Sequence, residues 1–225
     1  MFKDLIQSQV IGTLKIYDKD SGEILVQKKN AIHPGNMAYV LASALGGKPT
    51  SVNDVAGYVP HINWMGFGNG GSESTTTLSY RSPRVSSTYN GFPITSSDSS
   101  LYAPKYEQLT TNIVLYPGQV IDATATPPVV VPNNTAKVNF QVNLTHADYQ
   151  AAVLEVVPES DTSIDADAVA AFTIDEIGLM AGVTDSGDLL EKDKTLMLTH
   201  VTFHPVLLAA NRTIVIDYTI TIQIS

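Results

Sequence analysis

Alternating apolar and polar residues run along much of the chain, and the clearest example lies between Thr213 and Ile224. One set of alternate positions is apolar throughout: Ile214, Ile216, Tyr218, Ile220, Ile222 and Ile224. The intervening positions are mostly Thr, Asp and Gln. A period of two predicts a β-strand with one buried face. At roughly 3.3 Å per residue, this strand spans about 40 Å, about twice the common length.

Shorter runs with the same character predict further strands. Residues 14–17 and 24–27 flank the polar, glycine-containing stretch 18–22, which is typical of a β-hairpin with a longer loop. The other predicted strands are 62–67, 111–121, 136–144, 152–157, 172–180 and 196–204. The stretches 70–77, 96–100, 125–134 and 157–167 are rich in Ser, Thr, Asp, Pro or Gly and are predicted loops.

One segment has helical periodicity instead. After His33 and Pro34, apolar residues recur at Met37, Val40, Leu41, Ala44 and Leu45, which predicts a short helix over about 34–46. Many strands and one helix indicate a mainly β protein, an antiparallel β-sandwich or jelly-roll-like domain. At this length we expect a single domain over residues 1–225.

Composition narrows the possible partners. The formal net charge is -9, which repels nucleic-acid phosphates, so we expect no direct nucleic-acid partner. The chain has no cysteine, which excludes disulfides and thiolate metal sites. No apolar run approaches a membrane span, and the first residues lack the apolar region of a signal peptide. We therefore expect a chain made in the cytoplasm, without a membrane partner.

A glycine-rich stretch matches, by spacing, the G-x-G-x-x-G pattern of dinucleotide-binding folds. Its glycines are Gly66, Gly68, Gly70 and Gly71, with Asn69 between them. Dinucleotide binding requires a helix directly after the glycines and an acidic residue about twenty positions later. The chain offers neither, so we interpret the stretch as a tight structural turn in which Asn69 and Gly70 adopt positive φ.

Other candidate chemistry is equally weak, and we expect no catalytic residues, no cofactor and no metal site. His200 and His204 would lie about 13 Å apart on a strand, too far to share a zinc ion. Asp175 and Glu176 are adjacent and should point to opposite faces of a strand, so we expect Glu176 to be structural. Acidic clusters at 161–167 and 185–188 lack the EF-hand pattern and are interpreted as solvated loops.

Two motifs carry a family resemblance. The glycine turn is followed by a threonine-containing stretch, 75–78, and by Tyr80 and Arg81; about a hundred residues later comes Glu176-Ile177-Gly178-Leu179. This succession, over about two thirds of the chain, resembles the N-terminal domain of tail-collar fibre proteins of tailed bacteriophages. The resemblance implies a non-enzymatic virion protein of the neck or collar, tail or baseplate. Its expected partners are other virion proteins, including copies of itself, and its expected location is the virion.

Two features depart from that pattern, and other interpretations stay open. The chain has some sixty residues before the glycine turn and ends without a fibrous tail, which favours a compact particle component. An N-terminal extension, about 1–12, could contact a neighbouring subunit or pack on its own domain. The alternative function is a capsid decoration protein or carbohydrate-binding β-sandwich using Tyr89, Phe92, Tyr102 and Tyr106. A polysaccharide-cleaving enzyme is a weaker third possibility.

Overall fold

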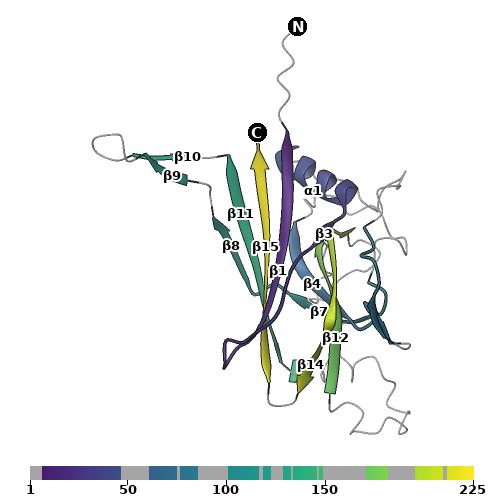
Figure 1. The fold of residues 1–225 in the computed structure, drawn as a ribbon. Coiled ribbons are helices and arrows are strands. Elements are labelled where there is room, and N and C mark those ends of the chain that lie inside the picture. The colour runs from purple at the N-terminus through teal and green to yellow at the C-terminus, as the bar shows by residue number, and fades with distance from the viewer. Residues whose placement is uncertain are drawn as a thin grey trace, which may run out of the picture.

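Two antiparallel β-sheets face each other in the computed structural model, with one helix at one end (Figure 1). The structure describes residues 7–46, 61–74, 77–85, 101–116, 119–122, 129–132, 134–145, 147–148, 171–181, 196–209 and 212–225. The fold of these residues is β-sandwich-like. The predicted class, mainly antiparallel β with one short helix, is confirmed.

The first sheet has five strands, and the two ends of the chain meet at its centre. Its order is β2 (Ile24–Lys29), β1 (Ser8–Asp18), β15 (Thr213–Ile224), β11 (Thr135–Thr145) and β8 (Asn112–Tyr116). β15 pairs along nearly its whole length with β1 on one side and β11 on the other. Its predicted bounds and the predicted hairpin of β1 and β2 are confirmed.

The second sheet has six strands. Its order is β3 (Ala31–Ile32), β14 (Thr199–Ala209), β12 (Ala171–Ala181), β4 (Ile62–Gly68) and β7 (Pro104–Leu109), with β13 (Leu196–Met197) also paired to β12. Two small hairpins lie outside these sheets: β5 (Ser72–Ser74) with β6 (Leu78–Tyr80), and β9 (Gln119–Asp122) with β10 (Val129–Pro132).

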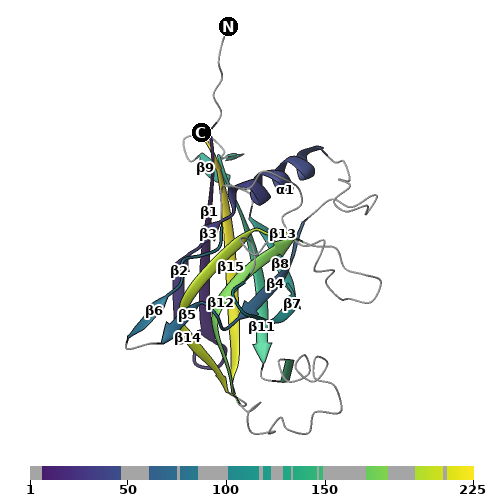
Figure 2. The same cartoon turned by 90° about the vertical axis from the view of Figure 1, so that its right-hand side faces the viewer.

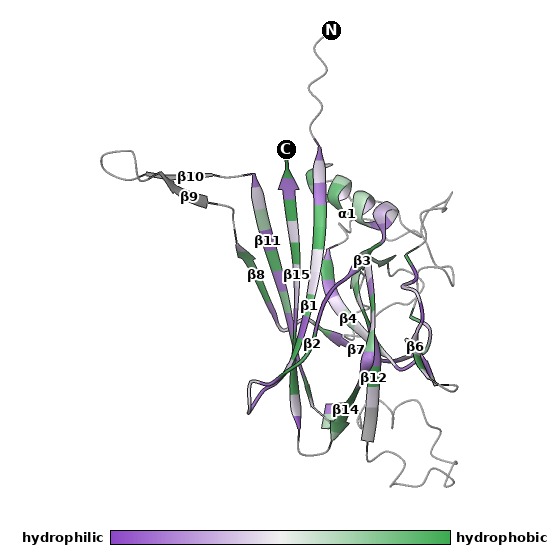
Figure 3. Cartoon of the chain, viewed as in Figure 1, coloured by the Kyte–Doolittle hydropathy of each residue, from purple (hydrophilic) through white to green (hydrophobic). Residues whose placement is uncertain are grey.

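The inner faces of the two sheets form the main core. On β15, Ile214, Ile216 and Tyr218 are fully buried, as their alternation predicts. They pack with inward residues of the six-stranded sheet such as Phe67 and Phe203. The same alternation appears as green and purple bands along the strands (Figure 3). Burial of these apolar side chains is the main driving force for the sandwich.

Helix α1 (Pro34–Gly46) crosses one end of the sandwich (Figures 1 and 2) and has the predicted bounds. His33 is its N-cap: the ring Nδ1 accepts a hydrogen bond from the Asn36 backbone N–H at 3.1 Å. Pro34 occupies the first helical position, where no backbone donor is needed. The Asn36 side chain donates to the Met197 carbonyl at 2.7 Å, which fastens the helix to the six-stranded sheet.

Several predicted boundaries differ from the structure. The predicted strand 111–121 is two strands, β8 and β9, and the predicted loops 70–77 and 125–134 contain β5 and β10. The predicted strand 196–204 continues as β14 to Ala209. Residues 152–157, 96–100 and 157–167 lie outside the described residues.

The N-terminal residues are part of the five-stranded sheet from Ser8 onward. Ser8 pairs with Ile224, and the ladder continues through β1 without a break. Residues 8–12 therefore pack on their own domain. Residues 1–6 lie outside the described residues, and their contact with a neighbouring subunit stays a prediction.

Candidate functional site

The outer face of the six-stranded sheet carries part of both sequence motifs: the glycine turn lies beside Glu176 there. Chain segments 69–72, 81–85 and 101–103 form hydrogen bonds with side chains on this face. A small apolar cluster is also buried there: Trp64, Leu101, Met180 and Met197. This part of the sheet is thus covered on both faces, which explains how acidic side chains of β12 come to be buried.

Asp175 binds the backbone directly after the glycine turn. Its Oδ1 accepts from the Gly71 N–H at 2.7 Å. Its Oδ2 accepts from the Ser72 N–H at 2.9 Å and from the Ser72 hydroxyl at 2.5 Å. Asp175 is only 3% exposed, so these three hydrogen bonds replace the hydration of its side chain.

Glu176 is fully buried and holds two separate segments together. Its Oε1 accepts from the Ala103 N–H at 2.8 Å and from the Gly70 N–H at 3.2 Å. Its Oε2 accepts from the Tyr102 N–H at 2.9 Å. The Glu176 side chain thus joins the glycine turn and the segment just before β7 to strand β12. We call Asp175, Glu176 and their partners the carboxylate junction.

His200 provides the fourth hydrogen bond to Glu176, through Nε2 to Oε2 at 3.0 Å. Its Nδ1 accepts from the Arg84 backbone N–H at 2.8 Å, so Nδ1 carries no proton. The neutral ring therefore donates from Nε2 to an ionised Glu176. Burial alone raises the pKa of Glu176, but the hydrogen bonds from His200, Ala103 and Tyr102 outweigh it, and the pKa lies below its ordinary value.

A break in strand register brings the two adjacent carboxylates to the same turn. Ile174 pairs with Val206, whereas Glu176 pairs with Thr202, so β12 and β14 lose register at Asp175. Such a bulge changes the direction of a side chain. Our expectation that Asp175 and Glu176 point to opposite faces is therefore wrong, because it assumes a regular strand.

The glycines of the turn serve close approach. Gly66 and Gly68 belong to β4, and a Cβ on Gly68 would lie 2.3 Å from Glu176 Oε1 and 2.7 Å from the Ala103 carbonyl oxygen. A Cβ on Gly71 would lie 2.4 Å from the Asp175 carbonyl oxygen. Gly70 does not have positive φ, so our expectation of positive φ at this residue is wrong. The glycines are needed here because a Cβ would collide with neighbouring atoms. Asn69 follows β4 and donates from its backbone to Ala103 at 3.2 Å.

The rest of the second motif is structural by position. Ile177 and Leu179 are fully buried in the main core. Gly178 lies on the other face, opposite Gly66 of β4, where a Cβ would approach the Met197 sulfur and the Thr199 carbonyl oxygen to 3.0 Å. Each residue of Glu176-Ile177-Gly178-Leu179 therefore has a packing or hydrogen-bonding role.

The aromatic residues considered for sugar binding have partners within the chain where the structure describes them. Two guanidinium groups lie near the ring of Tyr102, with the carbons of Arg84 and Arg81 at 4.0 Å and 4.9 Å from its centroid. The Tyr102 hydroxyl donates to the Ser82 carbonyl at 2.7 Å. Tyr106 stacks on Phe67, with ring centroids 5.9 Å apart. Burial, together with the Asp148 charge, raises the pKa of Tyr106 to about 12. Tyr89 and Phe92 lie outside the described residues.

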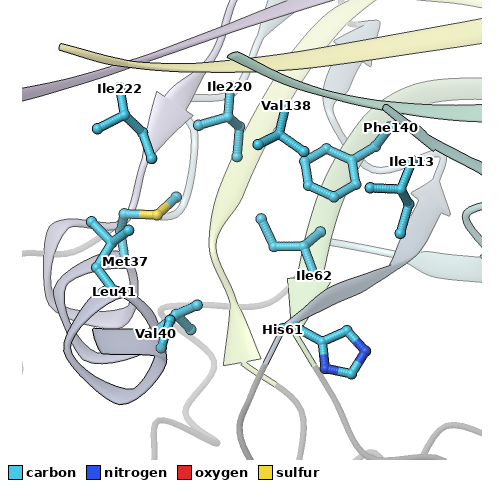
Figure 4. A pocket seen from close by; sticks show the side chains of 11 residues that line it. Met37, Val40, Leu41, His61, Ile62, Ile113, Val138, Phe140, Ile220 and Ile222 are labelled. Atoms are coloured by element: carbon cyan, nitrogen blue, oxygen red, sulfur yellow. The ribbon is translucent and has the colours of Figure 1, made fainter. Parts of the chain in front are cut away.

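An apolar groove of about 300 Å³ lies between α1 and the five-stranded sheet. Figure 4 shows Met37, Val40 and Leu41 of the helix facing Ile220 and Phe140 across it. Its lining also includes Ala44, His61, Ile62, Ile113, Val138 and Ile222. The groove is apolar and lies at the opposite side of the six-stranded sheet from the carboxylate junction.

Little in the junction suggests a reaction, because every carboxylate oxygen of Asp175 and Glu176 accepts a hydrogen bond from the chain itself. Among the described residues, no three His, Asp or Glu side chains are grouped to hold a metal ion, and none of the helices is long and apolar enough to cross a membrane. The acidic clusters at 161–167 and 185–188 lie outside that part of the chain. Comparisons with protein-family models, with characterised proteins and with solved structures gave no significant match.

Proposed function

We propose that this chain is a non-enzymatic structural protein of a tailed-bacteriophage virion. In this proposal it assembles as an oligomer at the neck or collar, the tail or the baseplate, with other virion proteins as partners. It needs no cofactor and no direct contact with nucleic acid or membrane. Its location is the particle, after synthesis in the cytoplasm of the bacterial host.

The observation that carries the proposal is the carboxylate junction. The two motifs that resemble tail-collar fibre proteins lie about a hundred residues apart in the sequence, yet Asp175 and Glu176 bind the backbone of Gly70, Gly71 and Ser72 directly. The motifs thus form one buried unit whose residues serve to hold the chain rigid. A catalytic carboxylate needs a free oxygen facing a cleft, and these carboxylates have none.

The distribution of polar groups also favours a structural role. The outer face of the five-stranded sheet has cross-strand hydrogen bonds, from Gln141 to Asp217 at 2.8 Å and from Asn139 to Thr219 at 3.1 Å. Such cross-strand pairs stabilise the association of neighbouring strands within the sheet. A structural protein that functions by contact with other virion proteins needs a rigid sheet surface more than it needs a binding cleft.

Mass spectrometry of purified phage particles tests the proposal. We expect the chain in particles at a fixed copy number relative to the major capsid protein, and retained through density-gradient centrifugation. Particles from a strain whose gene is interrupted are the control, and they should lack the chain and be defective in assembly or infection. Absence of the chain from intact wild-type particles would overturn the proposal.

A further inference from the structure

Strand β8 differs from the other strands at the edges of the two large sheets. Edge strands usually carry charges, prolines or irregularities that prevent pairing with other chains. Strand β2 ends in Lys28 and Lys29, β3 has two residues, and β7 begins with Pro104-Lys105. Strand β8, Asn112-Ile113-Val114-Leu115-Tyr116, has no charge, no proline and no glycine. Within the described chain, its one strand partner is β11.

Two exposed side chains of β8, those of Ile113 and Leu115, are aliphatic. Ile113 is 49% exposed and Leu115 is 64% exposed. Ile113 pairs with Phe140 and Leu115 with Val138, and both partners line the groove, so Ile113 and Leu115 lie on the inner face of the sheet. Ile113 is itself part of the groove lining (Figure 4). In the part of the chain that the structure describes, the inner face of the sandwich is thus partly exposed along this edge.

We propose that β8 pairs antiparallel with β8 of a second copy of this chain, around a twofold axis at Val114. In this register Val114 lies opposite its own copy, Ile113 lies opposite Leu115, and Asn112 lies opposite Tyr116. Directly opposite residues share a face of the sheet. All four exposed inner-face residues, Ile113 and Leu115 of both copies, therefore meet on the side of the groove. The pairing is isologous and closes as a dimer.

Self-complementarity is the reason to expect a second copy at this edge, because the twofold register places the exposed apolar residues Ile113 and Leu115 opposite each other. Two chains with a net charge of -9 repel each other, so such a self-contact also requires facing surfaces without acidic residues. Strand β8 has no acidic residue. On the neighbouring strand β11, the residue paired with Tyr116 is Lys137, which is exposed and cationic. The pairing gives hydrogen-bond partners to the outward-facing backbone N–H and C=O groups of both β8 strands. It also brings the apolar grooves of the two copies side by side on one face of the joined sheet.

This inference rests on the oligomeric part of the proposed function, but its test uses the isolated chain. In sedimentation velocity we expect the wild-type protein to be a dimer. Val114→Lys places two ammonium groups opposite each other and should raise the dimer Kd at least about tenfold. Val114→Glu should do the same, and an equimolar mixture of the two variants should dimerise again. Leu207→Lys, at a 48% exposed position on β14, is the matched control and should remain dimeric.

A crosslinking experiment tests the register. The chain has no cysteine, so Val114→Cys introduces a unique thiol. Opposite residues of an antiparallel pair have Cα atoms about 4.5 to 5.5 Å apart, which a disulfide can span. Leu115→Cys would lie diagonal to its own copy, about 7 to 8 Å away, and should crosslink poorly. The two variants differ by one position on the same exposed strand.

Three results would overturn the inference: a monomeric wild-type chain, a dimer that Val114→Lys leaves intact, or equal crosslinking of the two cysteine variants. Unchanged circular dichroism and melting temperature of the Val114 variants would confirm that their folds are intact. A β8 dimer that is missing from phage particles would support this inference and contradict the proposed function. A monomer found at fixed copy number in particles would do the reverse.

Discussion

Replacing Glu176 with Gln tests whether the carboxylate junction stabilises the fold. The change keeps the size of the side chain but replaces one acceptor oxygen by an NH₂ group. Four N–H groups point at the carboxylate, from Gly70, Ala103, Tyr102 and His200. Whichever way the amide is oriented, two of these donors face another donor.

The expected loss follows from those two donors. A hydrogen bond to a charged group contributes about 1.5 to 3 kcal/mol, and a buried donor left without an acceptor costs a similar amount. Two lost bonds at a fully buried site therefore predict a decrease of roughly 3 to 6 kcal/mol in the free energy of unfolding. This is a large part of the roughly 5 to 15 kcal/mol that stabilises a typical protein.

Urea denaturation of wild type and Glu176→Gln, at neutral pH, measures the difference. Hydrogen exchange locates it: the amides of Tyr102 and Ala103 should lose protection before those of the core strand β15. Glu73→Gln is the matched control. Glu73 is 49% exposed and pairs with Arg81 at the surface, so the control should change stability by less than about 1 kcal/mol.

The reasoning fails if Glu176→Gln unfolds within about 1 kcal/mol of wild type with an unchanged denaturant slope. It also fails if the amides of residues 102 and 103 exchange as slowly in the variant as in wild type. Either result would mean that the hydrogen bonds of the junction contribute little to holding the covering segments on the sheet.

Three further changes probe other parts of the structure. Gly68→Ala should destabilise the protein by about 2 kcal/mol or more in thermal melts, because its Cβ would lie 2.3 Å from Glu176 Oε1. Gly46→Ala is the control: a Cβ there would meet no atom within 4 Å, so this variant should melt close to wild type. Equal melting temperatures of the two variants would contradict this prediction. Tyr218→Phe should cost about 1 kcal/mol through loss of a buried hydroxyl contact with Asn30, and a wild-type urea midpoint would count against it. Stability should fall with acidification: burial lowers the pKa of His33 from 6.5, and hydrogen bonds lower that of Glu176 from 4.5. Both groups bind more protons in the unfolded state than in the folded state at acidic pH. The free energy of unfolding should therefore begin to decrease as the pH falls below about 6.5, and should decrease more steeply below about pH 4.5, until the folded pKa values are passed. A urea midpoint that stays constant from neutral to acidic pH would refute this prediction.

The strands with strong alternation could be predicted because one face of each is buried. The bounds of β15 follow from its isoleucines, and those of α1 follow from Pro34 and from apolar spacing at three and four residues. Both signals are local, and tertiary packing agrees with them. The end of β8 at Tyr116 also had a local signal, since Pro117-Gly118 follows it directly in the sequence.

The carboxylate junction could not be predicted, because its partners are distant in sequence and its geometry depends on a bulge. Alternation placed Asp175 and Glu176 on opposite faces, and nothing near them indicates irregularity. The available signal lay on the neighbouring strand: Pro205 lies inside β14, within the residues where its register against β12 shifts. Proline within a sheet is typical of bulges and edges. His200 had no signal at all, because the side chain that pairs with it is 24 positions away.

The carboxylate junction also has a consequence for how the chain folds. The residues of the glycine turn are synthesised early. Glu176, which bonds to the turn, and His200, which bonds to Glu176, emerge from the ribosome about a hundred residues later or more. Closing so long a loop costs chain entropy before any hydrogen bond forms, and sandwiches of this kind fold in milliseconds to seconds. The turn should therefore acquire its native structure late, and refolding of this chain should be slow compared with that of helical proteins of similar size.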